Sequence, residues 1–348
     1  MTSSTFSRRD FYKIGAGAAA AIAMPSIARA DPDSLVVSTT GGKTEEALVA
    51  AVLKPFTEKT GIKIITTSSV YAKVRSMVEA KAVEWDVFFA DGAINGGFGK
   101  QGLLEPIDYS VIDKSQFIPG GGNEFYIKQD IAPTVIAWNT RALKGDARPN
   151  TWAEFWDTKL FPGQRGFWKQ PQQSLELALL ADGVPRDKLY PLDLDRAFHS
   201  LEKLKPNNLY WWTAGAQGVQ LLIDGEFPLS MGWTSRLSEP RSSGAPIDYT
   251  LNDALLSGNS WAIIKGARNV AASTKLIAFG MEAKQQAEYC KILPYGPINT
   301  GALKLLSPER LKEIPSDETL KHAVFQDNDW WADNGPKVAE RFNKWLLT

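Results

Sequence analysis

The sequence predicts an α/β fold, and two observations carry that prediction. Short apolar runs typical of strands alternate with amphipathic helical stretches along the chain after residue 30. The first such unit, residues 35–67, has the pattern strand, glycine turn, helix, strand, which is the βαβ unit of a parallel sheet. Ligand sites of such sheets lie where the strands end, so residues that follow the strands are the candidate site residues.

The first 30 residues have the pattern of an export signal. Ser7 to Lys13 contains paired arginines, Ile14 to Ile27 is a short apolar run, and Ala28-Arg-Ala30 offers a small-x-small cleavage site. This pattern is typical of a twin-arginine signal peptide that is cleaved after Ala30. We therefore expect a periplasmic protein whose mature chain begins at Asp31.

The composition narrows the classes of function. In 348 residues, 39 Lys and Arg balance 39 Asp and Glu, so no nucleic-acid partner is expected. One cysteine, Cys290, and two histidines, His199 and His322, cannot form an iron–sulfur site or a closed Cys/His zinc site. We expect no cofactor and no metal. The chain also lacks a Gly-x-Ser-x-Gly elbow, a His/Cys pair and a phosphate loop, which argues against an enzyme.

The first half of the chain places two candidate sites at strand ends. Strands are predicted at 35–40, 62–67 and 85–90, and helices from about residue 44 and at 71–82, with Pro55 disturbing the first helix. Thr40, Gly41 and Gly42 lie at the end of the first strand. Asp91 follows the third strand, where it reads either as a ligand residue or as a plain helix N-cap.

The alternation continues to the end of the chain. The apolar run 131–139 is long enough to cross between two lobes, and a second crossing is expected at 252–259. Other strands are predicted at 165–169, 208–213, 228–233, 247–251 and 260–265, with helices after Thr151, at 175–181, 195–204, 216–224 and 270–281, and a last helix that begins at Pro336.

Two stretches of this half supply further candidates. Phe227 to Arg236 is an apolar strand that ends on Trp233 and a single arginine, so these residues read as ligand-facing or as core tryptophan and solvated cation. The turn Gln170 to Ser174 leads into a helix and carries Gln170 and Gln173. It reads equally as an anion cradle or as an ordinary cap.

Five stretches, in this order, carry a resemblance to a known family: Phe56 to Lys63, Trp85 to Val87, Thr151 to Trp156, Gly244 to Asp248 and Pro294 to Asn299. The chain resembles the spermidine/putrescine-binding-like periplasmic solute-binding proteins of ABC importers, over essentially the whole mature chain. The resemblance implies a two-lobed periplasmic binding protein fold of type II, with discontinuous lobes joined by a two-strand hinge. It also implies a monomer that binds a small molecule between the lobes and docks on a membrane permease.

The resemblance implies the lobe boundaries and the site. One lobe is expected at 31–135 plus about 258–303, and the other at 136–257 plus about 304–348. The residues that match ligand-facing positions are Thr40, Gly41, Gly42, Asp91, Gln170, Gln173, Trp233, Arg236, Asn259, Tyr295 and Trp331.

The chain departs from the polyamine-binding members where charge matters. Gln170, Gln173 and Asn259 stand where those members carry acids, and Arg236 lies at the mouth of the cleft. An ammonium group in a dry cleft needs a carboxylate partner. We therefore expect a carboxylate or an amino-acid-like zwitterion as ligand, with Arg236 on the acid and Asp91 available for an amine. A polyamine ligand, a sensory role and a periplasmic enzyme remain as alternatives.

Overall fold

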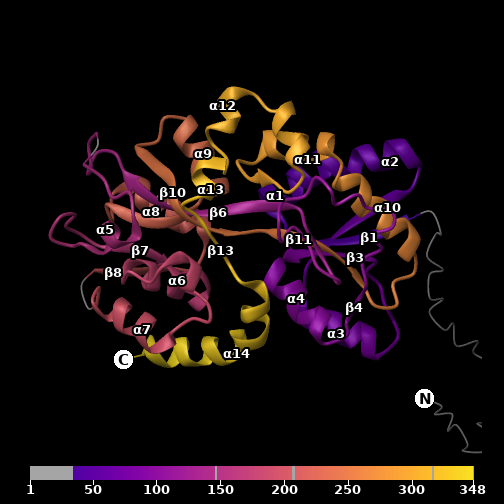
Figure 1. Cartoon of the computed structure of the whole chain (residues 1–348), viewed down its shortest axis with the longest axis horizontal. Coiled ribbons are helices and arrows are strands. Elements are labelled where there is room, and N and C mark those ends of the chain that lie inside the picture. Colours follow the sequence, from indigo (N-terminus) through magenta and orange to yellow (C-terminus); the bar gives the residue numbers. More distant parts are fainter. Residues whose placement is uncertain (1–33, 146, 206–207, 316, 348) are drawn as a thin grey trace, which may run out of the picture. The chain divides into compact units, whose positions relative to one another are not determined.

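The structure is a computed structural model that describes residues 34–347 except 146, 206, 207 and 316 (Figure 1). The predicted signal peptide, residues 1–30, lies outside the described residues. The described part is built on two β-sheets with helices around them, which confirms the predicted α/β class.

The first sheet contains the parallel strands predicted at the start of the chain. Its order is β2-β1-β3-β11-β4, and β5 pairs with β11. Strand β1 is parallel to both β2 and β3, whereas β11 is antiparallel to β3. The strands are β1 (Ser34–Thr39), β2 (Lys63–Ser68), β3 (Val87–Asp91), β4 (Leu104–Glu105), β5 (Ile127–Lys128) and β11 (Asn259–Ile264).

The helices near these strands include those predicted from about residue 44 and at 71–82 and 270–281, and two, at 92–100 and 283–292, that the sequence did not predict. They are α1 (Gly42–Leu48), the π-helical segment η2 (Val49–Leu53), α2 (Lys54–Thr60), α3 (Tyr71–Glu79), α4 (Gly92–Lys100), α10 (Val270–Gly280) and α11 (Ala283–Ile292). The π-helical segment ends two residues before Pro55, which has no N–H for the helical ladder. The disturbance predicted at Pro55 is therefore present, and it lies on the amino-terminal side of the proline.

The second sheet is mixed. Its order is β13-β10-β6-β9-β7-β8, and β12 pairs with β6. Strand β7 is parallel to β8 and β9, and β6 is antiparallel to β9 and β10. The strands are β6 (Asp130–Asn139), β7 (Arg165–Trp168), β8 (Leu209–Trp212), β9 (Leu229–Trp233), β10 (Ile247–Ser257), β12 (Gly296–Pro297) and β13 (Val324–Phe325).

The remaining helices are short apart from one, and two of them, Thr300–Leu305 and Pro308–Leu311, pack against α11. They are α5 (Trp152–Trp156), α6 (Pro171–Ala181), η3 (Arg186–Lys188), α7 (Leu194–Glu202), α8 (Gly215–Asp224), α9 (Thr234–Ser242), η4 (Thr300–Leu305), α12 (Pro308–Leu311), α13 (Asp317–Leu320) and α14 (Asn328–Trp345). Figure 1 shows α14 reaching from the side of the second sheet toward α4 beside the first.

Two very short connections join the sheets. Only Gln129 separates β5 from β6, and only Gly258 separates β10 from β11. A Cβ atom built on Gly258 would lie 2.1 Å from the carbonyl oxygen of Asp130. The two connections therefore pass in contact at a point where only glycine fits. The lobe boundaries predicted from the sequence stay a prediction.

Two sequence predictions are wrong in detail. Residues 252–257 do not separate two strands, because β10 continues to Ser257 through an irregular register between Thr250 and Leu255. The last helix begins at Asn328, where the Asp327 side chain accepts the N–H of Trp330, and Pro336 lies inside it. Arg236 lies in α9, which begins directly after β9.

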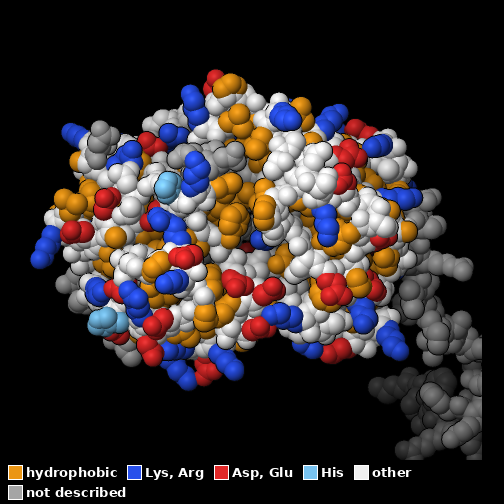
Figure 2. Space-filling model, viewed as in Figure 1, with side chains coloured by type: hydrophobic (Ala, Val, Ile, Leu, Met, Phe, Trp, Pro, Cys, Tyr) orange, Lys and Arg blue, Asp and Glu red, His pale blue; other side chains and the backbone are white. Residues whose placement is uncertain are grey.

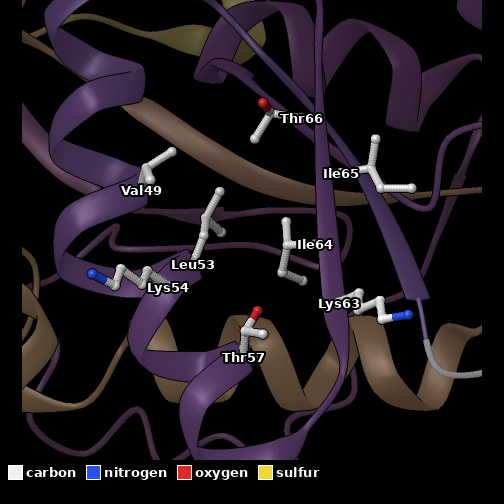
Figure 3. A pocket seen from close by; sticks show the side chains of 8 residues that line it. All are labelled: Val49, Leu53, Lys54, Thr57, Lys63, Ile64, Ile65 and Thr66. Atoms are coloured by element: carbon white, nitrogen blue, oxygen red, sulfur yellow. The ribbon is translucent and has the colours of Figure 1, made fainter.

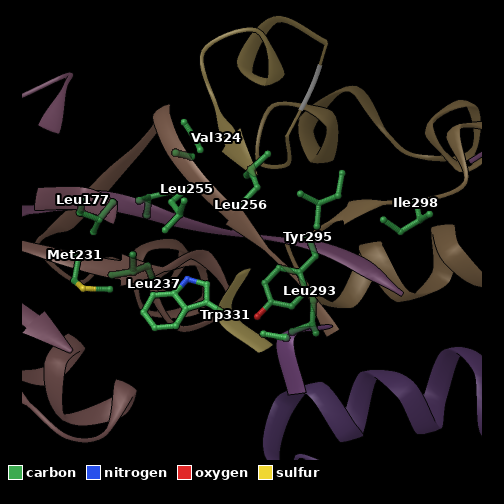
Figure 4. Close-up of a cluster of buried hydrophobic side chains, with 14 of the residues drawn as sticks. Leu177, Met231, Leu237, Leu255, Leu256, Leu293, Tyr295, Ile298, Val324 and Trp331 are labelled. Atoms are coloured by element: carbon green, nitrogen blue, oxygen red, sulfur yellow. The ribbon is translucent and has the colours of Figure 1, made fainter. Parts of the chain in front are cut away.

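The hydrophobic core reaches the region between the sheets. Its largest fully buried side chains include Trp152, Trp212 and Trp261. Figure 4 shows Tyr295 and Trp331 in one cluster with Leu237 of α9 and Leu255 of β10. Two aromatic residues that the sequence suggested as ligand contacts are therefore also packing residues.

Candidate functional site

A cavity of about 550 Å³ lies where strands of both sheets end. From the first sheet, Thr40 follows β1 and Asp91 ends β3. From the second, Trp168 ends β7 and Trp233 ends β9. The expectation that the site is formed by residues at strand ends matches this geometry.

The structure brings together most of the predicted site residues. Seven of them line this cavity: Thr40, Asp91, Gln173, Trp233, Arg236, Asn259 and Tyr295. A Cβ atom on Gly42 would lie 3.7 Å from Nη2 of Arg236, so Gly42 adjoins the cavity, and Gly41 is the N-cap residue of α1 beside it.

Gln170 and Trp331 lie elsewhere, in an adjoining chamber. This chamber of about 350 Å³ shares Tyr71, Ile94 and Gln172 with the main cavity. The Trp331 indole N–H donates to Oε1 of Glu176 at 2.6 Å, and only 5% of Trp331 is exposed. Its geometry is that of a buried residue tied to the second half of the molecule.

Arg236 occupies an unusual position for an arginine. It lies in the first turn of α9, whose N-terminus has no side-chain cap and no acidic residue in that turn. A helix N-terminus carries partial positive charge, so a cation there is unfavourable unless an anion is nearby. Among the described residues, no carboxylate lies within 4.0 Å of the guanidinium. The backbone N–H groups at the N-terminus of α9 and the guanidinium of Arg236 thus form one positively charged end of the cavity, where Ser235 also lies.

Lys43 adds to the charge at this end. It lies in the first turn of α1 and lines the same cavity. Its ammonium lies 3.6 Å from the carboxylate of Glu239 on α9 and 3.4 Å from that of Glu46. The pair with Glu239 raises the pKa of Lys43 and connects the two halves of the molecule across the cavity.

Asp91 supplies the opposite charge. One carboxylate oxygen accepts the N–H of Ala93 at 2.9 Å, so Asp91 is the N-cap of α4 as well as a lining residue. Burial raises the pKa of the Asp91 carboxyl, and hydrogen bonds from Ala93 and Gln172 and the charge of Lys128 oppose that rise. Both readings offered by the sequence are compatible with this geometry, because the second carboxylate oxygen is not needed for the cap.

Aromatic rings and one constrained amide form the wall between the charged ends. Trp168 and Trp233 lie edge to face, with ring centroids 5.2 Å apart. The side-chain oxygen of Gln173 accepts from the Trp233 indole at 2.9 Å and from the Thr134 hydroxyl at 3.0 Å. Gln173 holds a left-handed backbone conformation, with φ at 70°. Such strain in a non-glycine residue is typical of functional sites.

Tyr295 and Asn259 are also fixed by hydrogen bonds. The Tyr295 hydroxyl lies 2.8 Å from that of Ser235, and burial raises the pKa of Tyr295 above its ordinary range. Asn259 donates its backbone N–H and its side-chain N–H to the buried carboxylate of Asp130. Both residues therefore reach the cavity from rigid surroundings.

Sequence reasoning missed several lining residues: Lys43, Thr44, Tyr71, Ile94, Ala132, Trp168, Gln172, Ser235, Ser257 and Gly258. The strand-end rule could have found Trp168, because it is the last residue of β7. Tyr71 lies on the first turn of α3 and Lys43 on that of α1, and no local pattern predicted that either would face the other sheet.

A second hollow of about 550 Å³ lies far from this site, on the first sheet. It runs between the helical segment Val49 to Thr57 and the edge strand β2, and Figure 3 shows its mainly apolar lining with Lys54 and Lys63. It carries no acid among its lining residues. The cavity between the sheets is therefore the candidate site.

Residues 34–347, apart from the four undescribed positions, lack two kinds of feature. No group of three or more His, Cys, Asp or Glu side chains is placed to hold a metal ion there, and no helix in that part could span a membrane. On the face shown in Figure 2, acidic and basic side chains are interspersed over both halves.

Comparisons with known proteins identify the family. Residues 51–321 match the family model described as bacterial extracellular solute-binding protein. A gamma-aminobutyric acid-binding protein of Pseudomonas aeruginosa is 33% identical over 333 residues, covering 93% of this chain and 94% of the relative. A spermidine/putrescine-binding periplasmic protein of Escherichia coli is 24% identical over 300 residues, with 81% and 84% covered.

Two solved structures of similar proteins support the same family. A GABA receptor of known structure superposes with a TM-score of 0.84 at 36% identity, covering 90% of this chain and 97% of that one. An ABC transporter substrate-binding protein from Bradyrhizobium japonicum gives a TM-score of 0.85 at 33% identity, with 90% and 99% covered. The chain belongs to the bacterial extracellular solute-binding proteins and is a substrate-binding protein of an ABC transporter.

Proposed function

We propose that the ligand is an amino-acid-like zwitterion, held with its carboxylate on Arg236 and its ammonium on Asp91. The observation that carries this proposal is the pair of opposite charges in one cavity, with the guanidinium of Arg236 lacking a carboxylate partner in the described part of the chain. A guanidinium binds a carboxylate through two parallel hydrogen bonds, and the N–H groups at the start of α9 add favourable charge. Relatives named for binding GABA, a small zwitterion, support the same choice.

A polyamine fits this cavity less well. Asp91 is the one carboxylate among the described lining residues, whereas Arg236 brings a positive charge and Lys43 is already paired with Glu46 and Glu239. A diamine needs an acid for each ammonium group, because an unpaired buried charge costs several kcal/mol. The charge balance of the cavity therefore favours a ligand with one cationic and one anionic group.

The apolar body of the ligand would lie against the tryptophans. Trp168 and Trp233 present their rings between the two charged ends, and indole rings bind an aliphatic chain through dispersion and burial. A ligand that touches Asp91 on one sheet and Arg236 on the other favours the closed arrangement of the two halves by its differential affinity for it.

The same proposal covers the cellular role. We infer that residues 1–30 direct export, that the mature protein works as a monomer in the periplasm, and that its closed form delivers the ligand to a membrane permease. The paired arginines of the leader and the family membership support this inference. The lobe boundaries inferred from the sequence belong to this proposal as well.

The test is a binding screen with the mature protein. We expect 4-aminobutanoate or a related zwitterion to bind, and putrescine and spermidine to bind more weakly. A ligand at 100 times its Kd should add about 2.7 kcal/mol to the free energy of unfolding, which thermal-shift assays detect. Stabilisation by polyamines alone would contradict the proposal.

Arg236→Ala tests the role of the guanidinium. Charge-assisted hydrogen bonds contribute about 1.5–3 kcal/mol, so the variant should bind a zwitterion at least about tenfold more weakly. Arg241→Ala is the matched control, because Arg241 lies on the same helix, outside the cavity lining, and pairs with Asp248. Unchanged affinity in Arg236→Ala would sink the assignment of the carboxylate end.

A further inference from the structure

A buried carboxylate stands behind the anionic end of the cavity. Asn259 begins β11 and is the register partner of Asp91 on β3, and both residues line the cavity. Behind Asn259 lies Asp130, the first residue of β6, which is fully buried. Asp130 does not line the cavity, so any effect on a ligand acts through Asn259.

The hydrogen bonds of Asp130 fix which end of the Asn259 amide faces the ligand. The backbone N–H of Asn259 donates to Oδ1 of Asp130 at 3.0 Å, and its side-chain Nδ2 donates to Oδ2 at 3.1 Å. An ionised carboxylate only accepts, so the NH2 end must face Asp130. No described residue donates to the remaining amide oxygen of Asn259, which belongs to a half-buried residue of the cavity wall.

The carboxylate itself has no freedom to turn. The Tyr289 hydroxyl donates to Oδ2 of Asp130 at 2.9 Å. Gly258, directly before Asn259, passes so close that a Cβ there would lie 2.1 Å from the Asp130 carbonyl oxygen and 3.1 Å from Oδ1. The orientation of the Asn259 amide is thus imposed by the crossing of the two connections between the sheets.

We propose that Asp130 is a positioning residue for the ligand's ammonium group, which it serves by turning the amide oxygen of Asn259 toward the cavity beside Asp91. The ammonium then donates to one carboxylate oxygen of Asp91 and to the amide oxygen of Asn259. This inference rests on the proposed function and adds a second acceptor at its cationic subsite. It also predicts which ligand group is selected, because an Asn259 amide with its NH2 toward the cavity would favour a ligand carboxylate over an ammonium.

The test compares two probes of similar length by calorimetry. In 4-aminobutanoate one end is an ammonium, and in glutarate both ends are carboxylates. Asp130→Asn offers Asn259 an NH2 group, so the Asn259 amide can reverse. We expect at least a tenfold loss of affinity for 4-aminobutanoate and an unchanged or higher affinity for glutarate. If Asp130→Asn folds and the ratio of its affinities for 4-aminobutanoate and glutarate equals that of the wild type, the inference is wrong.

Two further variants separate positioning from a general structural effect. If Asp130 acts through Asn259, the double variant Asp130→Asn/Asn259→Ala binds 4-aminobutanoate no more weakly than Asn259→Ala alone, whereas additive losses contradict the inference. Tyr289→Phe removes the other partner of Asp130 and leaves Asn259 untouched, so both affinities should stay within twofold. Asp130→Ser replaces Asp130→Asn if the latter does not fold.

Failure of this inference differs from failure of the proposed function. If the wild-type protein binds 4-aminobutanoate and Asp130→Asn keeps the wild-type ratio of affinities for 4-aminobutanoate and glutarate, only the positioning role is wrong. If the wild-type protein binds polyamines and no zwitterion, both proposals fall.

Discussion

The buried carboxyl of Glu176 predicts how the free energy of unfolding depends on pH. Glu176 lies on α6 with no exposed surface, and its Oε1 accepts from the Tyr190 hydroxyl at 2.7 Å and from the Trp331 indole at 2.6 Å. Its Oε2 is buried without a hydrogen-bond partner in the described part of the chain. Burial therefore raises the pKa of Glu176 from 4.5 to about 7, with the two hydrogen bonds opposing the rise.

The sign of the effect follows from proton binding. Below pH 4.5 the carboxyl is protonated in both folded and unfolded chains. As the pH rises toward 7, the unfolded chain ionises first, so the free energy of unfolding falls until Glu176 also ionises in the folded protein. A rise from 4.5 to about 7 is roughly 2.5 pKa units, which corresponds to about 3 kcal/mol lost between pH 4 and pH 8.

Glu176→Gln should remove this loss. Glutamine cannot ionise, and its side-chain oxygen can still accept from Tyr190 and Trp331. The wild-type protein should therefore lose about 3 kcal/mol more than the variant between pH 4 and pH 8. The buried NH2 group of the glutamine shifts the variant's stability by a similar amount at every pH, so the difference in slope is the decisive quantity.

The assay is urea unfolding of both proteins at several pH values, extrapolated to water. Glu226→Gln is the control, because Glu226 is exposed, and its pH profile should follow that of the wild type. Asp130, whose pKa burial raises to about 6, contributes a fall over an overlapping range in every one of these proteins. Parallel profiles for Glu176→Gln and the wild type would refute the reasoning.

Three further changes have defined outcomes. Arg236→Lys keeps the charge but not the two parallel hydrogen bonds, so calorimetry should place its affinity for 4-aminobutanoate between wild type and Arg236→Ala. Burial raises the pKa of Asp91, so affinity should rise with pH through that pKa, and Asp91→Asn should bind weakly without this dependence. Gly92→Ala should lower the unfolding free energy by about 1–3 kcal/mol, because its Cβ would lie 2.1 Å from Nδ2 of Asn328. Gly97→Ala, with 3.8 Å to the nearest atom, should not.

The order of the longer strands and of several helices could be predicted from local periodicity, whereas helices α4, α9 and α11 were not predicted. Strand β3 is a continuous apolar run up to Asp91, and β9 contains the apolar residues Leu229, Met231 and Trp233 at every second position. Helix α9 has no such pattern, since it is polar and contains Pro240. It is held by tertiary contacts, such as the Thr234 hydroxyl bond to the Pro294 carbonyl, which no local signal reports.

Site residues could be predicted from the sequence where they end a strand. They could not be predicted where they lie on helices that reach the cavity. Asp91 and Trp233 end their strands, and parallel strands bring such residues to one edge. Lys43 and Tyr71 reach the cavity from helices, so their position depends on how the two sheets face each other. Trp331 was assigned to the ligand by resemblance, but its indole hydrogen bond to Glu176 holds it in the wall of the adjoining chamber.

The position of Arg236 connects ligand charge with closure. Its Nη2 lies 3.7 Å from the position of a Cβ on Gly42, so an arginine of the second half reaches the N-terminus of α1 in the first. Without an anion, a guanidinium beside the N-termini of α9 and α1 is destabilising, and this repulsion favours separation of the halves. A ligand carboxylate makes this interaction favourable, because the carboxylate is attracted to the guanidinium and to both helix N-termini at once. If Arg236 binds the ligand carboxylate as proposed, the same arginine also makes closure depend on the charge of the ligand.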